Sequence, residues 1–149
     1  MNEKKDYPRP AYTADNCVIL VPDDPTEELE RILLIVRKND PFKGFWALPG
    51  GYVNEGETSE DASRREASEE VGIDLPGMPT LIGIFDSPGR DPRGWTVAAA
   101  YRWYLPSFMA DLILLYDAAD VRWFPVDSLP ENLAFDHLKI IQKAINYRG

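Results

Sequence analysis

Three glutamates close together on a predicted helix give this sequence its clearest chemical signal. At about 100° per residue, Glu66, Glu69 and Glu70 fall within roughly 100° of one another, so their carboxylates project from one face. Like charges this close disfavour each other's ionisation, and hard divalent cations with oxygen ligands relieve that repulsion. The spacing therefore predicts a Mg²⁺ or Mn²⁺ site, although on spacing alone a solvated acidic helix face is the commoner explanation.

The helix that carries these glutamates is predicted to run from about Ser59 to Val71. Thr58 or Ser59 suits the N-cap, and Gly72 suits the stop. Its apolar positions hold only small residues, so core packing does not explain the helix. The elements expected around it are strands near 14–21, 31–37, 46–53, 81–85, 95–105 and 121–124, and a helix over 135–147.

The glutamates belong to a longer pattern that starts before the helix. In order it comprises Gly51, Glu57, Arg65-Glu66, Glu69-Glu70 and Gly72-Ile73. This pattern resembles the Nudix hydrolase box at every defining polar and glycine position, with Ala67 where the family usually has a larger aliphatic residue. The resemblance implies an α/β/α sandwich with a mixed central sheet, one domain over residues 1–149, and hydrolysis of a nucleoside diphosphate linked to another moiety.

The same resemblance assigns roles within the box. Glu57 would pair with Arg65 to hold the loop against the helix through charge-assisted hydrogen bonds. Glu66 and Glu70 are the candidate catalytic residues, with Glu66 the more plausible base, although in parts of the family the base comes from a later loop. The implied metal ligands are the carbonyl of Gly50 and the side chains of Glu66, Glu69 and Glu70.

Segments outside the box resemble the ADP-ribose pyrophosphatase branch of this family. They are residues 43–51, 88–94 and 133–137, and Pro88 lies fifteen positions after Ile73, as in that branch. The resemblance implies AMP and ribose 5-phosphate as products. The alternatives are a pyrophosphohydrolase of nucleoside triphosphates, oxidised ones included, or of another nucleotide sugar, because the box identifies the reaction and not the leaving group.

Substrate contacts are expected from four further residues. Arg90 and Arg93 would meet phosphate or ribose oxygens, with a solvated loop as an equal alternative. Trp46 could add a base-stacking wall, although packing is the commoner role, and Asp117 could serve as an acidic partner. His137 either lines the site or is a structural hydrogen-bonding residue at a helix start.

Residues 107–116 depart from the resemblance. They form an apolar run where relatives usually carry a short polar loop rich in glycine and aspartate, and Tyr116 replaces a commonly acidic neighbour of Asp117. This departure leaves the substrate and the late base open. The run could instead bury against a second subunit, and a homodimer is an expectation from the family.

Composition limits the remaining function classes. A net charge of -9 over 149 residues argues against binding nucleic acid, which needs clustered Lys and Arg. Cys17, the only cysteine, precedes an apolar run and is expected to be a buried thiol. There is no leader-like N-terminus and no apolar run long enough to span a bilayer, so a cytoplasmic enzyme on a small-molecule nucleotide is expected.

A function of another class is an ADP-ribose sensor. Similar Nudix domains occur in transcriptional regulators that bind ADP-ribose without needing to cleave it. Those regulators append a winged-helix domain, for which we expect no room here, and every acidic position of the box is kept. The sequence therefore favours an enzyme.

Overall fold

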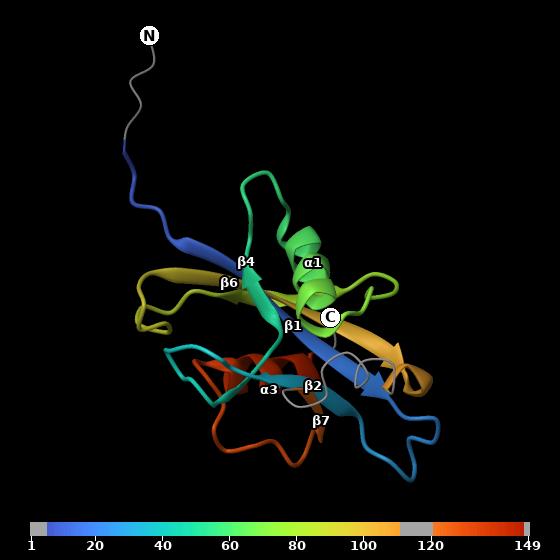
Figure 1. Ribbon diagram of the computed structural model, residues 1–149. Coiled ribbons are helices and arrows are strands. Elements are labelled where there is room, and N and C mark those ends of the chain that lie inside the picture. The colour runs from blue at the N-terminus through green and yellow to red at the C-terminus, as the bar shows by residue number, and fades with distance from the viewer. Residues whose placement is uncertain (1–5, 111–120, 148–149) are drawn as a thin grey trace.

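The computed structural model of the chain describes residues 6–110 and 121–147. Within them a mixed seven-stranded sheet lies between α1 (Ser59–Val71) and α3 (His137–Asn146) (Figure 1). The strands are β1 (Ala11–Val21), β2 (Arg31–Val36), β3 (Trp46–Ala47), β4 (Gly50–Tyr52), β5 (Thr80–Phe85), β6 (Thr96–Pro106) and β7 (Val121–Pro125), and a 3-10 turn spans Ser107–Met109. No helix in the described ranges is long and apolar enough to cross a membrane.

The sheet is built around two long parallel strands. β1 and β6 pair from Ala11 and Thr96 to Val21 and Pro106. β2, β3 and β7 extend the sheet on one side of this pair and β5 on the other, all by antiparallel pairing, while the short β4 pairs with the start of β1. The predicted mixed sheet is confirmed. β1 begins earlier than the expected residue 14, because the pairing with β6 continues back to Ala11.

Each face of the sheet has its own hydrophobic core. Side chains that alternate along a strand point to opposite faces, so β2 sends Leu33 towards α1 and Ile32 towards α3. Ile140 of α3 packs in the second core together with Cys17, which is fully buried as expected. Two cores on opposite faces confirm the α/β/α arrangement.

The prediction that core packing does not explain the box helix is wrong. Ala62, Ala67 and Val71 have no exposed surface, and Ala67 and Val71 belong to the first core. Their small side chains let the helix axis lie close to the sheet, where larger residues would hold it away. Ala67 is therefore a packing residue of a closely seated helix.

A buried polar link fixes where α1 sits. Asn16 of β1 is fully buried, and its Nδ2 donates to the backbone carbonyl of Ser63 at 2.9 Å. Its Oδ1 accepts from Nε1 of Trp103 on β6 at 2.9 Å. Since both polar atoms of Asn16 are satisfied, the link ties the helix to the two central strands and sets the height of its glutamates.

The ends of α1 lie where the sequence places them. The hydroxyl of Thr58 accepts from the backbone N–H of Asp61 at 3.0 Å, which caps the first turn. Gly72 ends the helix in the left-handed conformation, with φ of 70°. The predicted boundaries Ser59 and Val71 are confirmed.

Candidate active site

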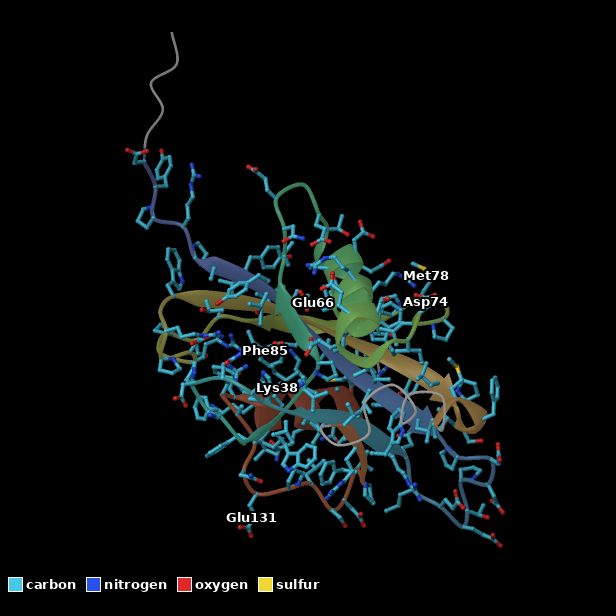
Figure 2. All side chains as sticks on the ribbon, viewed as in Figure 1. Lys38, Glu66, Asp74, Met78, Phe85 and Glu131 are labelled. Carbon is cyan, nitrogen blue, oxygen red and sulfur yellow. The ribbon has the colours of Figure 1, made fainter. Side chains whose placement is uncertain are left out.

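The side chains of Glu66, Glu69 and Glu70, here called the acidic helix face, come from the part of α1 next to β4. Gly50 of β4 donates its backbone N–H to Oε1 of Glu70 at 2.8 Å. A Cβ added to Gly51 would lie 2.5 Å from the carboxylate of Glu66, a distance that a real Cβ does not adopt. Figure 2 shows Glu66 between α1 and β4. The two glycines therefore let the backbone of β4 touch the carboxylates directly.

Arg65 connects the box loop to the acidic helix face. Its Nε and Nη2 donate to Oε2 and Oε1 of Glu57 at 2.7 and 3.0 Å, so the predicted pairing of these two residues is confirmed as a contact. Its Nη1 donates to Glu66 at 2.8 Å and to Glu69 at 3.2 Å. Hydrogen bonding raises the pKa of Arg65 and lowers that of Glu57, so both groups stay charged.

Glu70 is the most perturbed carboxyl of the three. Burial raises its pKa to about 8, against the hydrogen bond from Gly50, and the nearby charges of Glu66 and Asp15 add to the rise. Its repulsion from the neighbouring carboxylates is therefore not cancelled within the site. A positive charge placed among these groups would stabilise the ionised form of Glu70.

The donor set suits a hard divalent cation. The acidic helix face and the carbonyl of Gly50 supply oxygen atoms alone, the ligands that Mg²⁺ and Mn²⁺ prefer. In the part of the chain that the structure describes, however, no three His, Cys, Asp or Glu side chains already stand as a metal cluster. Arg65 lies among these carboxylates, bonded to Glu57, Glu66 and Glu69.

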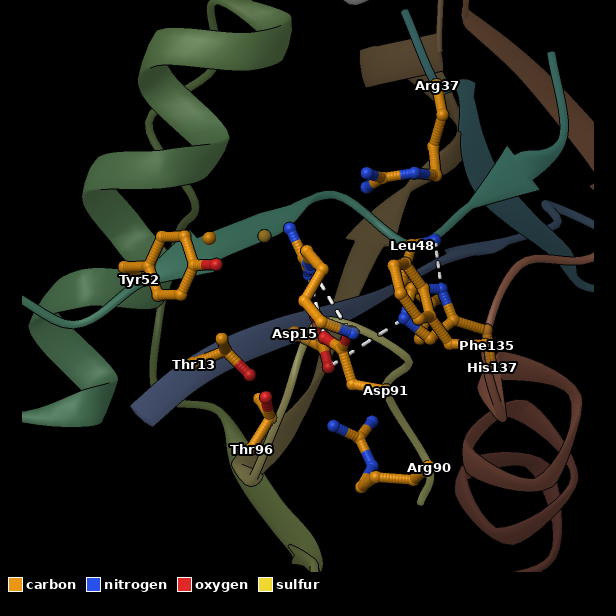
Figure 3. A pocket seen from close by; sticks show the side chains of 13 residues that line it. Thr13, Asp15, Arg37, Leu48, Tyr52, Arg90, Asp91, Thr96, Phe135 and His137 are labelled. Atoms are coloured by element: carbon orange, nitrogen blue, oxygen red, sulfur yellow. Dashed lines mark hydrogen bonds and ion pairs between the residues drawn. The ribbon is translucent and has the colours of Figure 1, made fainter. Parts of the chain in front are cut away.

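An inner cavity of about 190 Å³ adjoins these same glycines (Figure 3). Its walls come from β1, from β4 and the segment just before it, from the residue after β2, from the loop between β5 and β6 with the first residue of β6, and from the start of α3. They are formed by Thr13, Asp15, Arg37, Leu48, Gly50, Gly51, Tyr52, Arg90, Asp91, Arg93, Thr96, Phe135 and His137.

The two arginines predicted to meet substrate both line the inner cavity, and each has a carboxylate partner. Arg90 donates two hydrogen bonds to Asp136, at 2.6 and 2.9 Å, and its side chain is 5% exposed. Arg93 binds Asp91 at 2.8 and 3.1 Å and is 39% exposed. Burial would raise the pKa of Asp91, but the bonds from Arg93 outweigh burial and lower it. Arg93 is thus the more accessible of the two.

Aromatic rings hold the guanidinium groups at the wall of the cavity. Arg93 lies over the ring of Tyr52 at 5.8 Å and over that of Phe135 at 5.2 Å. Arg37 also lies over Phe135, at 4.8 Å. Such cation–π contacts leave the N–H edge of a guanidinium able to bind an anion. This wall can therefore meet phosphate oxygens.

His137 has both of the roles expected for it. Its Nδ1 accepts the backbone N–H of Leu48 at 3.0 Å, which makes it a structural residue, and its ring also lines the inner cavity. Burial lowers its pKa to about 3, so the ring is neutral at physiological pH and its proton sits on Nε2. Nε2 faces Oδ2 of Asp15 at 3.9 Å.

Trp46 lies in a packing position. Its ring meets Phe124 edge to face at 4.9 Å, Arg122 lies over it at 5.2 Å, and it does not line the inner cavity. These contacts fit the packing alternative of the sequence prediction. Asp117 lies outside the described residues, and so do residues 111–116 of the apolar run, Tyr116 included.

Several lining residues were not predicted from the sequence, Asp15 and Thr13 above all. The available signal was their position in a strand that is otherwise buried. A carboxylate in such a strand needs a partner or a function. Asp136 could not be recognised in that way, because only the fold brings it to Arg90.

The chain is similar to known proteins along most of its length. The model of the NUDIX domain matches residues 13–144. An ADP-ribose pyrophosphatase of Methanocaldococcus jannaschii is 40% identical over 143 residues, which cover 96% of this chain and 78% of that protein.

Two further similar proteins respond to or bind ADP-ribose. The ADPR responsive transcriptional repressor NtrR of Acinetobacter baylyi is 34% identical over 95% of this chain, which spans only 56% of the repressor. The NUDIX domain of Shewanella oneidensis NrtR, crystallised with ADP ribose, superposes with a TM-score of 0.73 at 27% identity, covering 93% of this chain and 88% of that one.

Proposed function

Because this chain belongs to the Nudix family and is a pyrophosphohydrolase of that family, we propose that it hydrolyses ADP-ribose to AMP and ribose 5-phosphate with Mg²⁺ or Mn²⁺. One observation carries the proposal: the acidic helix face and the inner cavity meet at Gly50 and Gly51. A diphosphate at the carboxylates would have its attached group beside the cavity. The similar archaeal ADP-ribose pyrophosphatase supports this substrate.

The cation would be held by oxygen atoms at the junction of β4 and α1. A divalent ion bound there supplies neutralisation of the charge that develops on the diphosphate. The glycine backbone allows this approach, since a side chain at Gly51 would occupy the place of the Glu66 carboxylate. The proposed ligands are the carbonyl of Gly50 and the side chains of Glu66, Glu69 and Glu70.

The side chains around the proposed cation have different roles. Glu66 is the proposed base: it takes a proton from the water that attacks phosphorus while the bond to the leaving phosphate oxygen breaks. Glu70, which accepts the N–H of Gly50, is held against β4 and keeps the diphosphate site in register with the cavity. Arg65 and Glu57 are positioning residues, because they orient Glu66 and Glu69 and lie away from the cavity lining.

On the substrate side, Arg93 is the arginine proposed to contact phosphate or ribose oxygens. It lines the inner cavity and is partly exposed, whereas Arg90 is buried against Asp136 and supports the wall. The roles of Trp46 in stacking and of Asp117 as an acidic partner stay predictions, as do a homodimer and a cytoplasmic location.

A panel of substrates tests the proposal. The purified protein is incubated with ADP-ribose, another nucleotide sugar or a nucleoside triphosphate, each with and without Mg²⁺, and products are separated by chromatography. We expect AMP and ribose 5-phosphate from ADP-ribose, only with the cation. Preferred release of diphosphate from the triphosphate would overturn the substrate assignment.

An ADP-ribose sensor is the second candidate, favoured by the similarity to the ADPR responsive repressor. That function predicts saturable binding of ADP-ribose, measured by calorimetry, and no turnover with any cation. The same panel distinguishes the two, since a sensor yields no AMP at protein concentrations where binding is complete.

A further inference from the structure

Asp15 is a buried carboxylate that lacks a donor. Its side chain is 10% exposed and lines the inner cavity, where Figure 3 shows it near the centre. Among the described residues no hydrogen bond to its side chain is made, and the closest polar partner is Nε2 of His137 at 3.9 Å. Buried polar groups are nearly always hydrogen-bonded. This unmet acceptor therefore points to a ligand that donates hydrogen bonds.

The neighbouring charges do not satisfy it. Arg90 is held by Asp136 and Arg93 by Asp91, each through two hydrogen bonds. Each of these bidentate pairs uses Nε and Nη2 of the guanidinium, and neither arginine bonds to Asp15. Among the described residues that line the cavity, Asp15 is therefore the carboxyl group without a bidentate arginine partner, and its oxygens stay available as hydrogen-bond acceptors.

Thr13 extends the same surface. It lies two residues before Asp15 on β1, so both side chains point to one face of the strand about 6.6 Å apart. Thr13 is 9% exposed, lines the inner cavity, and its hydroxyl makes no hydrogen bond to the rest of the described chain. The pair offers one carboxylate acceptor and one hydroxyl. Neutral groups that both donate and accept, such as sugar hydroxyls, match it.

The size of the cavity sets which part of a ligand can enter. Its volume of about 190 Å³ is smaller than the roughly 300–1,000 Å³ of pockets that hold a whole drug-sized ligand. It is large enough for one part of a ligand whose diphosphate lies at Gly50 and Gly51. A sugar ring is the smaller of the two groups that a sugar-linked nucleoside diphosphate carries, and is therefore the better match to this volume.

We propose that Asp15 and Thr13 bind hydroxyl groups of the terminal sugar on the diphosphate, and so select a sugar-linked nucleoside diphosphate over a nucleoside triphosphate. This inference rests on the proposed function for the position of the diphosphate. In the sugar-linked substrate, hydroxyls donate to Asp15. In a triphosphate, the terminal phosphate offers acceptor oxygens, which donate no hydrogen bond to the acceptor oxygens of Asp15.

The variant Asp15→Asn tests the inference, because asparagine keeps the shape and removes the anion. We expect kcat/KM for ADP-ribose to fall about tenfold or more, mainly through KM, as for loss of a hydrogen bond to a charged group. Activity on a nucleoside triphosphate should stay level or rise. Thr13→Val should give a smaller loss on ADP-ribose alone. Asp74→Asn, at an exposed aspartate away from the cavity (Figure 2), is the matched control and should match the wild type.

Product inhibition provides a second readout. Ribose 5-phosphate should inhibit Asp15→Asn several-fold more weakly than the wild type, while inhibition by AMP should not change. Equal losses on sugar-linked and triphosphate substrates would overturn the inference, and so would an unchanged ratio between them. A higher Mg²⁺ requirement in Asp15→Asn with unchanged inhibition by ribose 5-phosphate would instead assign Asp15 to the cation and would also overturn it.

A direct binding experiment separates this inference from the proposed function. If the wild type releases no AMP from ADP-ribose, the proposed function fails. Calorimetry of ribose 5-phosphate with the wild type, Asp15→Asn and Asp74→Asn still tests the cavity. Binding that is lost only in Asp15→Asn supports the sugar site, and equal affinity in all three contradicts it.

Discussion

The acidic helix face and the inner cavity lie on either side of the same two glycines, yet they differ in how their carboxylates are paired with arginines. At the helix face Arg65 bonds to Glu66, to Glu69 and to Glu57 of the preceding loop, and among the described residues Glu70 has no cationic partner at hydrogen-bond distance. In the cavity Arg90 and Arg93 each have their own aspartate. The surplus of carboxylates suits one region to a cation, whereas the paired charges make the other a shaped and nearly balanced wall. Reaction and substrate selection are therefore separable.

The largest expected effect separates catalysis from stability. Glu70→Gln keeps an oxygen for the N–H of Gly50 and removes the negative charge of a proposed cation ligand, so kcat/KM for ADP-ribose should fall about 10²- to 10³-fold. The variant should unfold at the same temperature as the wild type or higher, because burial already disfavours the ionised carboxylate. Glu55→Gln, in the exposed box loop, is the control. Full activity in Glu70→Gln would remove Glu70 from the site.

The second prediction concerns the stability of the cavity wall. Asp136→Asn leaves the guanidinium of Arg90 buried without its counter-charge, which should lower the free energy of unfolding by about 3 kcal/mol. Urea unfolding of this variant and of Asp74→Asn measures the difference. Asp136 makes no side-chain cap bond to α3, so loss of a cap does not confuse the result. Unchanged stability would show that the pair contributes nothing to the wall.

The third prediction concerns a variant that weakens the contacts of Arg65 with the carboxylates around it. Lysine at position 65 cannot fork to both oxygens of Glu57 while reaching Glu66. Arg65→Lys should therefore reduce kcat/KM about 10- to 100-fold, as supporting residues of metal sites do. The exposed Arg31→Lys is the matched control. The role of Arg65 as a positioning residue is wrong if kcat/KM stays within twofold.

The smallest effect is a pH dependence of stability in the cavity. The pKa of His137 is about 3 in the folded protein and near 6.5 when unfolded, so the unfolded chain takes up the proton first as pH falls. Stability from this group is present above pH 6.5 and is lost between 6.5 and 3, at about 1.4 kcal/mol per pH unit.

The variant His137→Asn isolates that dependence. Asparagine can still accept the N–H of Leu48 but does not titrate. Asp15, whose pKa is raised to about 7 by burial, changes in the opposite direction in both proteins. Relative to the wild type, the variant should therefore gain stability between pH 6.5 and 4.5 in urea unfolding. Parallel curves for the two proteins would show that His137 is already protonated when folded.

The contrast between the two regions also explains what the sequence could predict. Helix boundaries and the acidic face depend on residues near one another in the chain, so capping and spacing predicted them, and the resemblance to the Nudix box supplied the pairing of Glu57 with Arg65. The inner cavity joins Thr13 to His137, and no local pattern shows that Arg90 meets Asp136. The prediction about packing of α1 was wrong for a related reason. It considered only the size of the side chains on the helix, whereas the hydrogen bond from Asn16 to Ser63 holds the helix close to the sheet.

The parallel pairing of β1 with β6 has a consequence for the order in which the molecule acquires its parts. The cavity that Thr13 and Asp15 line also has walls from the loop before β6 and from Thr96 at its start, so the cavity is complete only when β6 has paired with β1. Contacts between such distant segments form late because the loop that joins them must close first. A growing chain on the ribosome can therefore complete the box helix long before it has a pocket. Binding of a ligand in the cavity would then require that β6 is in place, and it would stabilise the folded state by mass action.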